Sequence, residues 1–169
     1  MNKIGIFYGS SGGNTKEIAK RIAAKLNVNS SDMHDVASAA ASDLAPYDVL
    51  LFGSSTWGVG DLQDDWEGFI GTVASADLSG KKVGLFGCGD SSSYPDTFCD
   101  AMGKIYQTVK DRATAVIGYT GTAGYSFDAS ESVAGDRFVG LVIDEDNESN
   151  LSDERIDAWV TQLGKDLAS

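Results

Sequence analysis

Four short runs along this chain of 169 residues are apolar or glycine throughout, without the alternation of a half-exposed strand. They occupy residues 4–8 (IGIFY), 49–52 (VLLF), 83–86 (VGLF) and 115–117 (AVI). Continuous apolar runs are typical of strands that are buried on both faces, because helices cover both sides of a parallel sheet. The runs therefore predict interior strands of one parallel sheet.

Other apolar residues recur at helical spacing, which marks one buried face of a helix. The sets are Ile18, Ile22 and Leu26; Phe98, Met102, Ile105 and Val109; and Ile156, Val160, Leu163 and Leu167. Residues 33–36 give a weaker strand pattern, which we expect at an edge of the sheet. Strand and helix alternate, which predicts an α/β fold, a three-layer αβα sandwich with right-handed crossovers.

Residues 119–137 interrupt this alternation. They are rich in Gly, Ser and Thr and separate the run at 115–117 from another at 138–143 (FVGLVI), so we expect a last strand split by an inserted loop. With 42% hydrophobic residues and two prolines, residues 1–169 are expected to form a single domain with an adequate core. The chain has no apolar stretch of membrane-spanning length and no signal-peptide core, which predicts a cytoplasmic protein without membrane insertion.

Charge is unevenly distributed along the chain, whose formal net charge is −12. No Lys or Arg lies between Lys25 and Lys81, whereas that interval holds acidic residues throughout: Asp32, Asp35, Asp43, Asp48, Asp61, Asp64, Asp65, Glu67 and Asp77. One strongly negative side disfavours nucleic acid and anionic lipid as ligands and favours a basic protein partner. The alternative is that the acidity only keeps the protein soluble.

The cysteines and the single histidine indicate no metal or catalytic centre. Cys88 and Cys99 are too few for a disulfide framework and lack the CxxC spacing of a zinc site, so we expect buried thiols. His34 is distant in sequence from the loops described next, and we expect it at the surface without a role in proton transfer.

Three glycine-rich loops follow predicted strands: residues 9–15 (GSSGGNT), 54–60 (SSTWGVG) and 87–94 (GCGDSSSY). Ligands of open parallel sheets bind outside the carboxyl ends of the strands, where the strand order reverses, so three such loops would build one pocket. A glycine-rich turn before a helix that begins near Asn14 or Thr15 predicts an anion site in the first loop. An ordinary helix-capping turn is the alternative.

The first loop lacks both the Gly-Lys-Ser/Thr of a triphosphate loop and the GxGxxG of a dinucleotide site. The hydroxyls of Ser10, Ser11 and Thr15 suit a phosphate monoester held by uncharged groups. Trp57 and Tyr94 stand in the other two loops, where they could sandwich a flat heterocycle. Otherwise they are surface aromatics that pack on their own loops.

Taken together, these residues resemble the flavodoxin family, in its long-chain type, over essentially the whole chain. The matching segments are 4–10 with 13–15, 56–57 with 60 and 62–67, 86–90 with 94, and 138–141 with 144–147. The resemblance implies a five-stranded parallel sheet of order 2-1-3-4-5, non-covalently bound FMN, and a low-potential one-electron carrier that is not itself an enzyme. It also implies a monomer that serves basic redox proteins such as ferredoxin–NADP reductase, photosystem I or other reductive enzymes.

The resemblance assigns a role to each loop. The first would hold the FMN phosphate, Trp57 and Tyr94 would flank the isoalloxazine, backbone groups of 58–60 and 89–99 would bond its polar edge, and Asp146 would reach a ribityl hydroxyl. The cofactor-binding residues implied are Ser10, Ser11, Gly12, Gly13, Asn14, Thr15, Ser55, Thr56, Trp57, Gly58, Val59, Gly60, Cys88, Gly89, Asp90, Tyr94, Phe98, Cys99 and Asp146. In the family, the peptide at the position of Gly58 turns on one-electron reduction.

Three positions depart from the family pattern. Gly12 replaces the usual Thr or Ser, Ser55 stands where Pro is frequent, and residues 91–93 (SSS) are more polar than usual. These departures bear on phosphate affinity and on the rigidity of the loops.

Other proteins of this topology fit less well. A phosphate-accepting receiver domain needs acidic residues after its first and third strands, where this chain has Gly9 and Ser54, and a low-molecular-weight phosphatase needs a Cys and an Arg around the first loop. The remaining alternative is an FMN-dependent NAD(P)H:quinone reductase. Such an enzyme needs basic residues for its second substrate, and the interval 27–80 has none.

Overall fold

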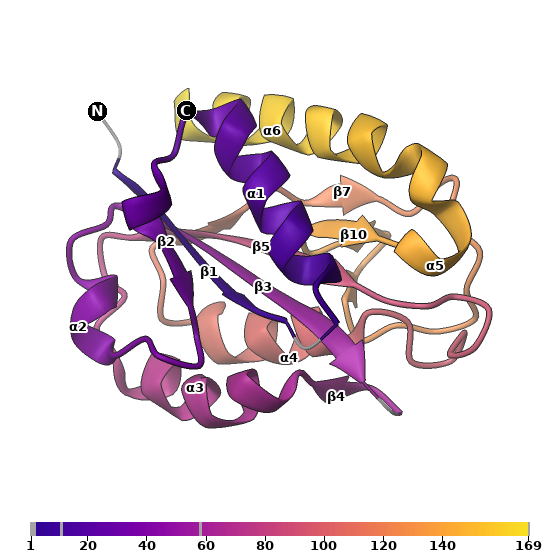
Figure 1. The fold of residues 1–169 in the computed structure, drawn as a ribbon, viewed down its shortest axis with the longest axis horizontal. Helices are drawn as coiled ribbons and strands as arrows, with labels where there is room; N and C mark the ends of the chain where they lie inside the picture. Colours follow the sequence, from indigo (N-terminus) through magenta and orange to yellow (C-terminus); the bar gives the residue numbers. More distant parts are fainter. Residues whose placement is uncertain (1–2, 11, 58, 169) are drawn as a thin grey trace.

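A parallel sheet forms the centre of the computed structural model, which describes residues 3–10, 12–57 and 59–168 (Figure 1). Its strands follow the order β10-β5-β3-β1-β2, which is the predicted order 2-1-3-4-5. The bounds are β1 (Ile4–Gly9), β2 (Met33–Asp35), β3 (Val49–Trp57), β5 (Lys82–Cys88), β6 (Ala115–Ile117) and β10 (Leu141–Ile143). The weak strand β2 lies at an edge, as predicted. A short strand that the sequence did not indicate, β4 (Asp61–Leu62), pairs antiparallel with the end of β3.

The last strand is split, as expected. Both β6 and β10 pair in parallel with β5, β6 near its start (Lys82 beside Ala115) and β10 near its end (Phe86 beside Leu141). Between them, the inserted segment forms a small antiparallel sheet of β7 (Thr120–Gly121), β9 (Arg137–Phe138) and β8 (Val133–Ala134). The apolar run at 138–143 is therefore divided between two sheets and is not one strand.

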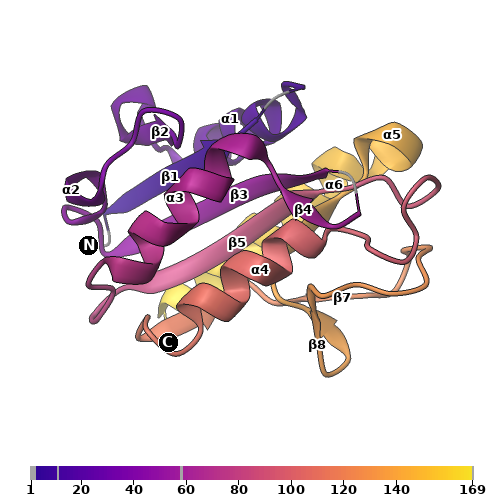
Figure 2. The same cartoon turned by 90° about the horizontal axis from the view of Figure 1, so that it is seen from below.

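Helices cover both faces of the main sheet (Figures 1 and 2). One face carries α1 (Asn14–Leu26) and α6 (Ser152–Ala168), and the other carries α3 (Asp64–Ser75) and α4 (Asp100–Val109). The shorter elements are α2 (Ala41–Leu44), α5 (Glu145–Glu148), η1 (Ser30–Asp32) and η2 (Ser149–Leu151). None of the described helices combines the length and the apolar character that crossing a bilayer requires.

Two helices differ from the sequence-based expectation. α3 was not among the predicted helices, although Trp66, Phe69 and Val73 form its buried face. α4 begins at Asp100, so Phe98 precedes the helix instead of belonging to it. The reason is Cys99, which has a left-handed φ of 55° that no residue inside an α-helix adopts.

The continuous apolar strands are buried on both sides, as predicted. In β1, Phe7 packs into the core under α3 and α4, whereas Ile6 and Tyr8 pack into the core under α1 and α6. In β3, Leu50 and Leu51 divide between the two cores in the same way. Successive side chains of a strand point to opposite faces, so a strand between two helical layers must be apolar at every position.

The basic residues of α1 are used within the fold. Arg21 forms ion pairs with Glu17 at 3.6 Å, with Asp153 at 3.4 Å and with Glu145 at 3.8 Å. Lys25 pairs with an acidic residue of α6, Asp157. These contacts join α1 to α5 and α6 on the same face of the sheet, and they leave the acidic interval after Lys25 without compensation from these cations.

Two helical glycines provide a test of how closely the inserted segment packs. A Cβ at Gly103 in α4 would lie 2.4 Å from the carbonyl oxygen of Glu131, whereas a Cβ at Gly68 in α3 would meet nothing within 4 Å. We expect Gly68→Ala to raise the free energy of unfolding by about 0.5–1 kcal/mol, the usual gain of alanine over glycine in a helix. Gly103→Ala should lower it by about 1–3 kcal/mol, because backbone atoms must move. Urea denaturation of both variants measures the difference, and stabilisation by both would contradict the close packing.

Candidate functional site

A cavity of about 300 Å³ lies at the carboxyl ends of β1, β3 and β5. It is lined by Ser10, Gly12, Asn14, Ser55, Thr56, Trp57, Cys88, Gly89, Asp90, Tyr94, Glu145 and Asp146. The three loops therefore converge, as the sequence predicted. Glu145 was not among the predicted residues, and its only sequence signal was its position beside Asp146.

The first loop is built as the start of a helix. Gly13 has a φ of 92°, α1 begins at Asn14, and the Ser10 hydroxyl accepts a hydrogen bond from the Gly13 N–H at 3.0 Å. Thr15 is buried, and its hydroxyl has no hydrogen-bond partner of acceptable geometry among the described residues; its neighbour is the weakly polar Cys88 thiol. A buried hydroxyl without a partner costs free energy, so the Thr15 hydroxyl is available to donate to an acceptor at the first loop.

Two aromatic rings border the cavity. Trp57 is 46% exposed and Tyr94 is 43% exposed, although large aromatic side chains are usually mostly buried in folded proteins. The Trp57 indole N–H donates to the Ser55 hydroxyl at 3.0 Å, so Ser55 helps to orient the ring. The serine that replaces the frequent proline therefore has a structural role of its own.

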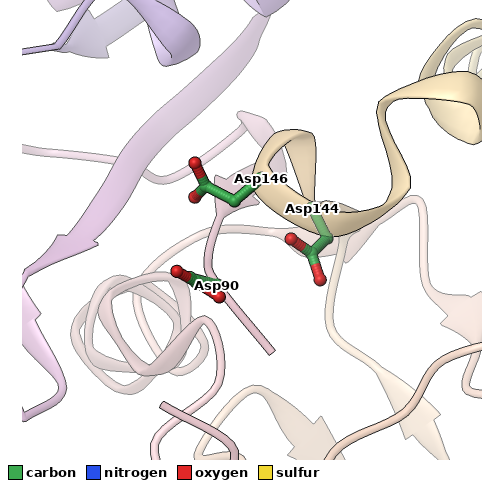
Figure 3. Close-up of side chains that lie close together, drawn as sticks. All are labelled: Asp90, Asp144 and Asp146. Atoms are coloured by element: carbon green, nitrogen blue, oxygen red, sulfur yellow. The ribbon is translucent and has the colours of Figure 1, made fainter. Parts of the chain in front are cut away.

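The third loop is tied to the start of α5 by two aspartates (Figure 3). Asp144 is fully buried and accepts hydrogen bonds from the Ser91 hydroxyl at 2.5 Å and from the Asn147 backbone N–H at 3.2 Å. Asp90 accepts from the Asn147 side chain at 2.9 Å and from the backbone of Ser92 at 3.1 Å. The polar residues 91–93 thus supply donors that fix the loop.

The carboxylates of Asp90, Asp144 and Asp146 approach one another within 4.8 Å. The hydrogen bond from Asn147 lowers the pKa of Asp90. Burial raises the pKa of Asp146, and the charges of Asp90, Asp144 and Glu145 raise it further. Because Asp90 and Asp144 already receive several hydrogen bonds, the cluster is explained as an anchor of the loop, with Asp146 as its more exposed member.

Both cysteines are buried free thiols, as predicted. Burial raises the pKa of Cys88 to about 12, the neighbouring Thr15 hydroxyl opposes the shift, and the charges of Glu145 and Asp146 add to it. Burial also raises the pKa of Cys99. Neither thiol is therefore poised as a nucleophile at neutral pH.

Several predicted residues do not line the cavity. These are Gly13, Thr15, Val59, Gly60, Phe98 and Cys99, while Ser11 and Gly58 lie outside the described residues. Val59 is 78% exposed, and the Phe98 ring is buried against Phe127 at 5.5 Å. Any contact of Phe98 with a ligand must therefore come from its backbone.

His34 does not occupy the surface position that we expected. Its ring is half-buried, stacks on Phe7 at 4.6 Å between ring centroids, and shares a hydrogen bond of 2.8 Å with the Tyr47 hydroxyl. The difference arises because β2, although an edge strand, places this side chain on the core face beside Phe7. It is not among the residues that line the cavity.

The anchoring role of Asp144 can be tested against its exposed neighbour. Asp144→Ala leaves the Ser91 hydroxyl and the Asn147 N–H without their acceptor, so we expect a loss of about 2–5 kcal/mol in the free energy of unfolding. Asp146→Ala is the matched control and should change stability by less than about 0.5 kcal/mol, as is usual at the surface. Chemical denaturation of the two variants measures both changes in the free energy of unfolding. Equal losses would contradict the anchoring role of Asp144.

Comparison with known proteins identifies the family. The family model described as flavodoxin matches residues 6–159. The chain is 46% identical to a flavodoxin of Klebsiella pneumoniae, covering 99% of this chain and 96% of that protein, and 46% identical to flavodoxin 1 of Escherichia coli K12, covering 96% and 93%. A crystal structure of Fusobacterium nucleatum flavodoxin bound to flavin mononucleotide superimposes with a TM-score of 0.91 at 28% identity, covering 98% of this chain and 99% of that one. With its three loops converging at the carboxyl ends of a 2-1-3-4-5 sheet, this chain belongs to the flavodoxin family.

Proposed function

We propose that residues 1–169 form one FMN-binding domain that carries single electrons between larger redox proteins, as a monomer in the cytoplasm. The observation that carries this proposal is the unpartnered Thr15 hydroxyl in the first turn of α1, next to a cavity flanked by two exposed aromatic rings. The similar Fusobacterium nucleatum flavodoxin reported above binds flavin mononucleotide. The inserted segment that splits the last strand supports the long-chain type.

The first loop suits the phosphate of FMN. Backbone N–H groups at the start of a helix are free to donate, and the helix dipole adds a partial positive charge there. The Ser10 hydroxyl accepts a hydrogen bond from within the loop and can still donate one to a ligand. The Thr15 hydroxyl has no hydrogen-bond partner of acceptable geometry among the described residues. Gly12 leaves open space, since a Cβ there would meet nothing within 4 Å. The loop thus offers only uncharged donors.

The rest of the cavity suits the flavin ring and the ribityl chain. Trp57 and Tyr94 would flank the ring, and Asp146 would accept a hydrogen bond from a ribityl hydroxyl. When bound, FMN supplies the one-electron chemistry, and the protein supplies orientation and electrostatics. Asp90, Glu145 and Asp146 line the cavity, and none of its described lining residues is Lys or Arg. These carboxylates disfavour further negative charge, so they should keep the reduction potential low.

The quinone-reductase alternative is not favoured. A nicotinamide substrate that carries phosphates needs cationic groups at the cavity, and the described lining has none. The most similar relatives reported above are named flavodoxins. Anaerobic mixing with NADPH alone is therefore expected to leave the bound flavin oxidised, and rapid reduction by NADPH would favour the reductase.

The phosphate assignment predicts a selective effect of Thr15→Val. This change keeps the shape of the side chain and removes a buried hydroxyl whose polar neighbour among the described residues is the Cys88 thiol, so the cofactor-free protein should be at least as stable as the wild type. FMN affinity should fall about 10- to 100-fold, because a hydrogen bond to a charged group contributes roughly 1.5–3 kcal/mol.

Quenching of flavin fluorescence measures both affinities. Riboflavin, which lacks the phosphate, is the internal control: it should bind the wild-type protein much more weakly than FMN does and should be insensitive to Thr15→Val. Equal binding of FMN and riboflavin to the wild-type protein would contradict the phosphate loop.

The proposed basic partner predicts salt-dependent electron transfer. Raising the ionic strength from 0.1 to 1 M shortens the Debye length from about 10 to about 3 Å, which should slow transfer to a basic reductase. Charge reversal at the exposed residues Asp64 and Glu67 of α3 should lower the rate and flatten the salt dependence. Glu154→Lys on α6, across the sheet, is the matched control and should have a smaller effect. Stopped-flow rates that do not change with salt would show that the acidity serves only solubility.

A further inference from the structure

Asp100, the first residue of α4, touches two segments that lie far apart in the sequence. The residue is buried, with 4% of its surface exposed. Its Oδ1 atom accepts a hydrogen bond from the backbone N–H of Glu131, in the inserted segment, at 2.7 Å. Its Oδ2 atom faces Gly60, where an added Cβ would lie only 2.8 Å away. One carboxyl group therefore forms a hydrogen bond with the inserted segment and packs closely against Gly60.

The start of α4 is also held by other hydrogen bonds on both sides. The Ala101 N–H donates to the hydroxyl of Thr56, which lines the cavity, at 3.1 Å. From the inserted segment, the Ser132 hydroxyl donates to the carbonyl of Cys99 at 2.5 Å. Hydrogen bonds thus connect the start of α4 both to the wall of the cavity and to the inserted segment. Asp100 lies between these two connections.

The bonding around Asp100 depends on a proton. Burial raises the pKa of Asp100 to about 6, and the Glu131 carboxyl raises it further. The hydrogen bond from the Glu131 N–H and the charge of Lys104 both lower this pKa. When protonated, Asp100 can donate to the Glu131 carboxylate while it still accepts from the Glu131 N–H. When ionised, it repels that carboxylate. The Cys99 thiol beside it stays neutral, because burial raises its pKa well above the usual range.

We propose that Asp100 is a positioning residue of the cofactor pocket, and that a proton on its carboxyl strengthens the link between the inserted segment and the Gly60 turn and so tightens FMN binding. This inference rests on the proposed function. The proton comes from solvent and returns to it, and no electron is transferred at Asp100. The protonated form binds FMN more tightly, so the extra affinity is present below pH 6 and is lost as the pH rises through the pKa of the FMN-bound form.

The experiment is a set of FMN affinities between pH 5 and 8, measured by fluorescence quenching. Asp100→Asn is a neutral analogue whose amide can accept from the Glu131 N–H and donate to the Glu131 carboxylate at every pH. Relative to this variant, the wild-type protein should lose about three- to tenfold in affinity across the range, which corresponds to a pKa shift of about half to one unit on binding. The FMN phosphate titrates in the same range but contributes equally to all variants.

Two further variants serve as controls that do not depend on the folding of Asp100→Asn. Asp111→Asn makes the same charge change at an exposed residue beyond the other end of α4, and its profile should follow the wild type. Glu131→Gln, at an exposed residue, removes a charge that raises the Asp100 pKa, so it should move the wild-type transition to lower pH even if Asp100→Asn folds poorly.

NMR of the carboxyl carbon of Asp100 in the cofactor-free protein gives a readout that does not depend on FMN, and a midpoint near pH 6 is expected. Parallel affinity profiles for the wild type and Asp100→Asn, an unmoved transition in Glu131→Gln, or a carboxyl midpoint near 4 would overturn this inference while FMN binding stands. A wild-type protein that binds FMN at no pH would overturn the proposed function and this inference together.

Discussion

The candidate site depends first on the pairing of β3 with β1 on one side and with β5 on the other. Its register places Ser54 beside Gly9 and Ser55 beside Cys88, so β1 and β5 end within one residue of the same level, while β3 continues to Trp57 between them. Glycine permits close packing at both places: a Cβ at Gly53 would lie 2.0 Å from the ring of Phe86 on the paired strand β5, and a Cβ at Gly9 would lie 2.2 Å from the side chain of Gln63, which caps α3. A slip of one residue would exchange the side chains that β3 presents to the two cores and would displace the ends of the strands relative to one another.

The inserted segment is packed into the fold as firmly as the elements that it separates. Phe127 and Tyr125 surround the buried Phe98 ring, and Arg155 of α6 lies over the Tyr125 ring at 3.8 Å. On the other side of this cluster, Phe98 leads into Cys99, whose left-handed backbone accepts a hydrogen bond from the Ser132 hydroxyl of the inserted segment. A conformation that costs a residue with a Cβ about 1–2 kcal/mol persists only where its surroundings enforce it. The insertion therefore helps to set where α4 begins and how the loop before it faces the cavity.

The sequence was sufficient for features that depend on burial and periodicity, and insufficient for those that depend on tertiary hydrogen bonds. The interior strands, the split last strand and the convergence of the three loops follow from apolar runs and from the rule that parallel strands end at one edge. The start of α4 could not be predicted, because the helical spacing continues back to Phe98 while contacts with residues 129–132 turn the chain at Cys99. For the same reason, nothing in the pattern SSS indicated that Ser91 donates to Asp144, or that His34 stacks on Phe7. Glu145 lines the cavity only because α5 follows β10 directly, which composition does not reveal.

The distribution of charge around the cavity explains why uncharged hydrogen-bond donors suit the first loop. Of the carboxylates that line the cavity, Glu145 is paired with Arg21 of α1 at 3.8 Å, whereas Asp90 and Asp146 form no ion pair with a described cation. Lys25 is engaged with Asp157 of α6. A lysine in the first loop would hold a phosphate more strongly, but it would also raise the potential felt by a ring in the same cavity. Backbone N–H groups and hydroxyls bind an anion through short-range hydrogen bonds and add no net charge. An acidic protein with a phosphate loop made only of uncharged donors can therefore bind an anionic cofactor and still keep the surroundings of its ring negative, which are the two requirements of a strongly reducing carrier.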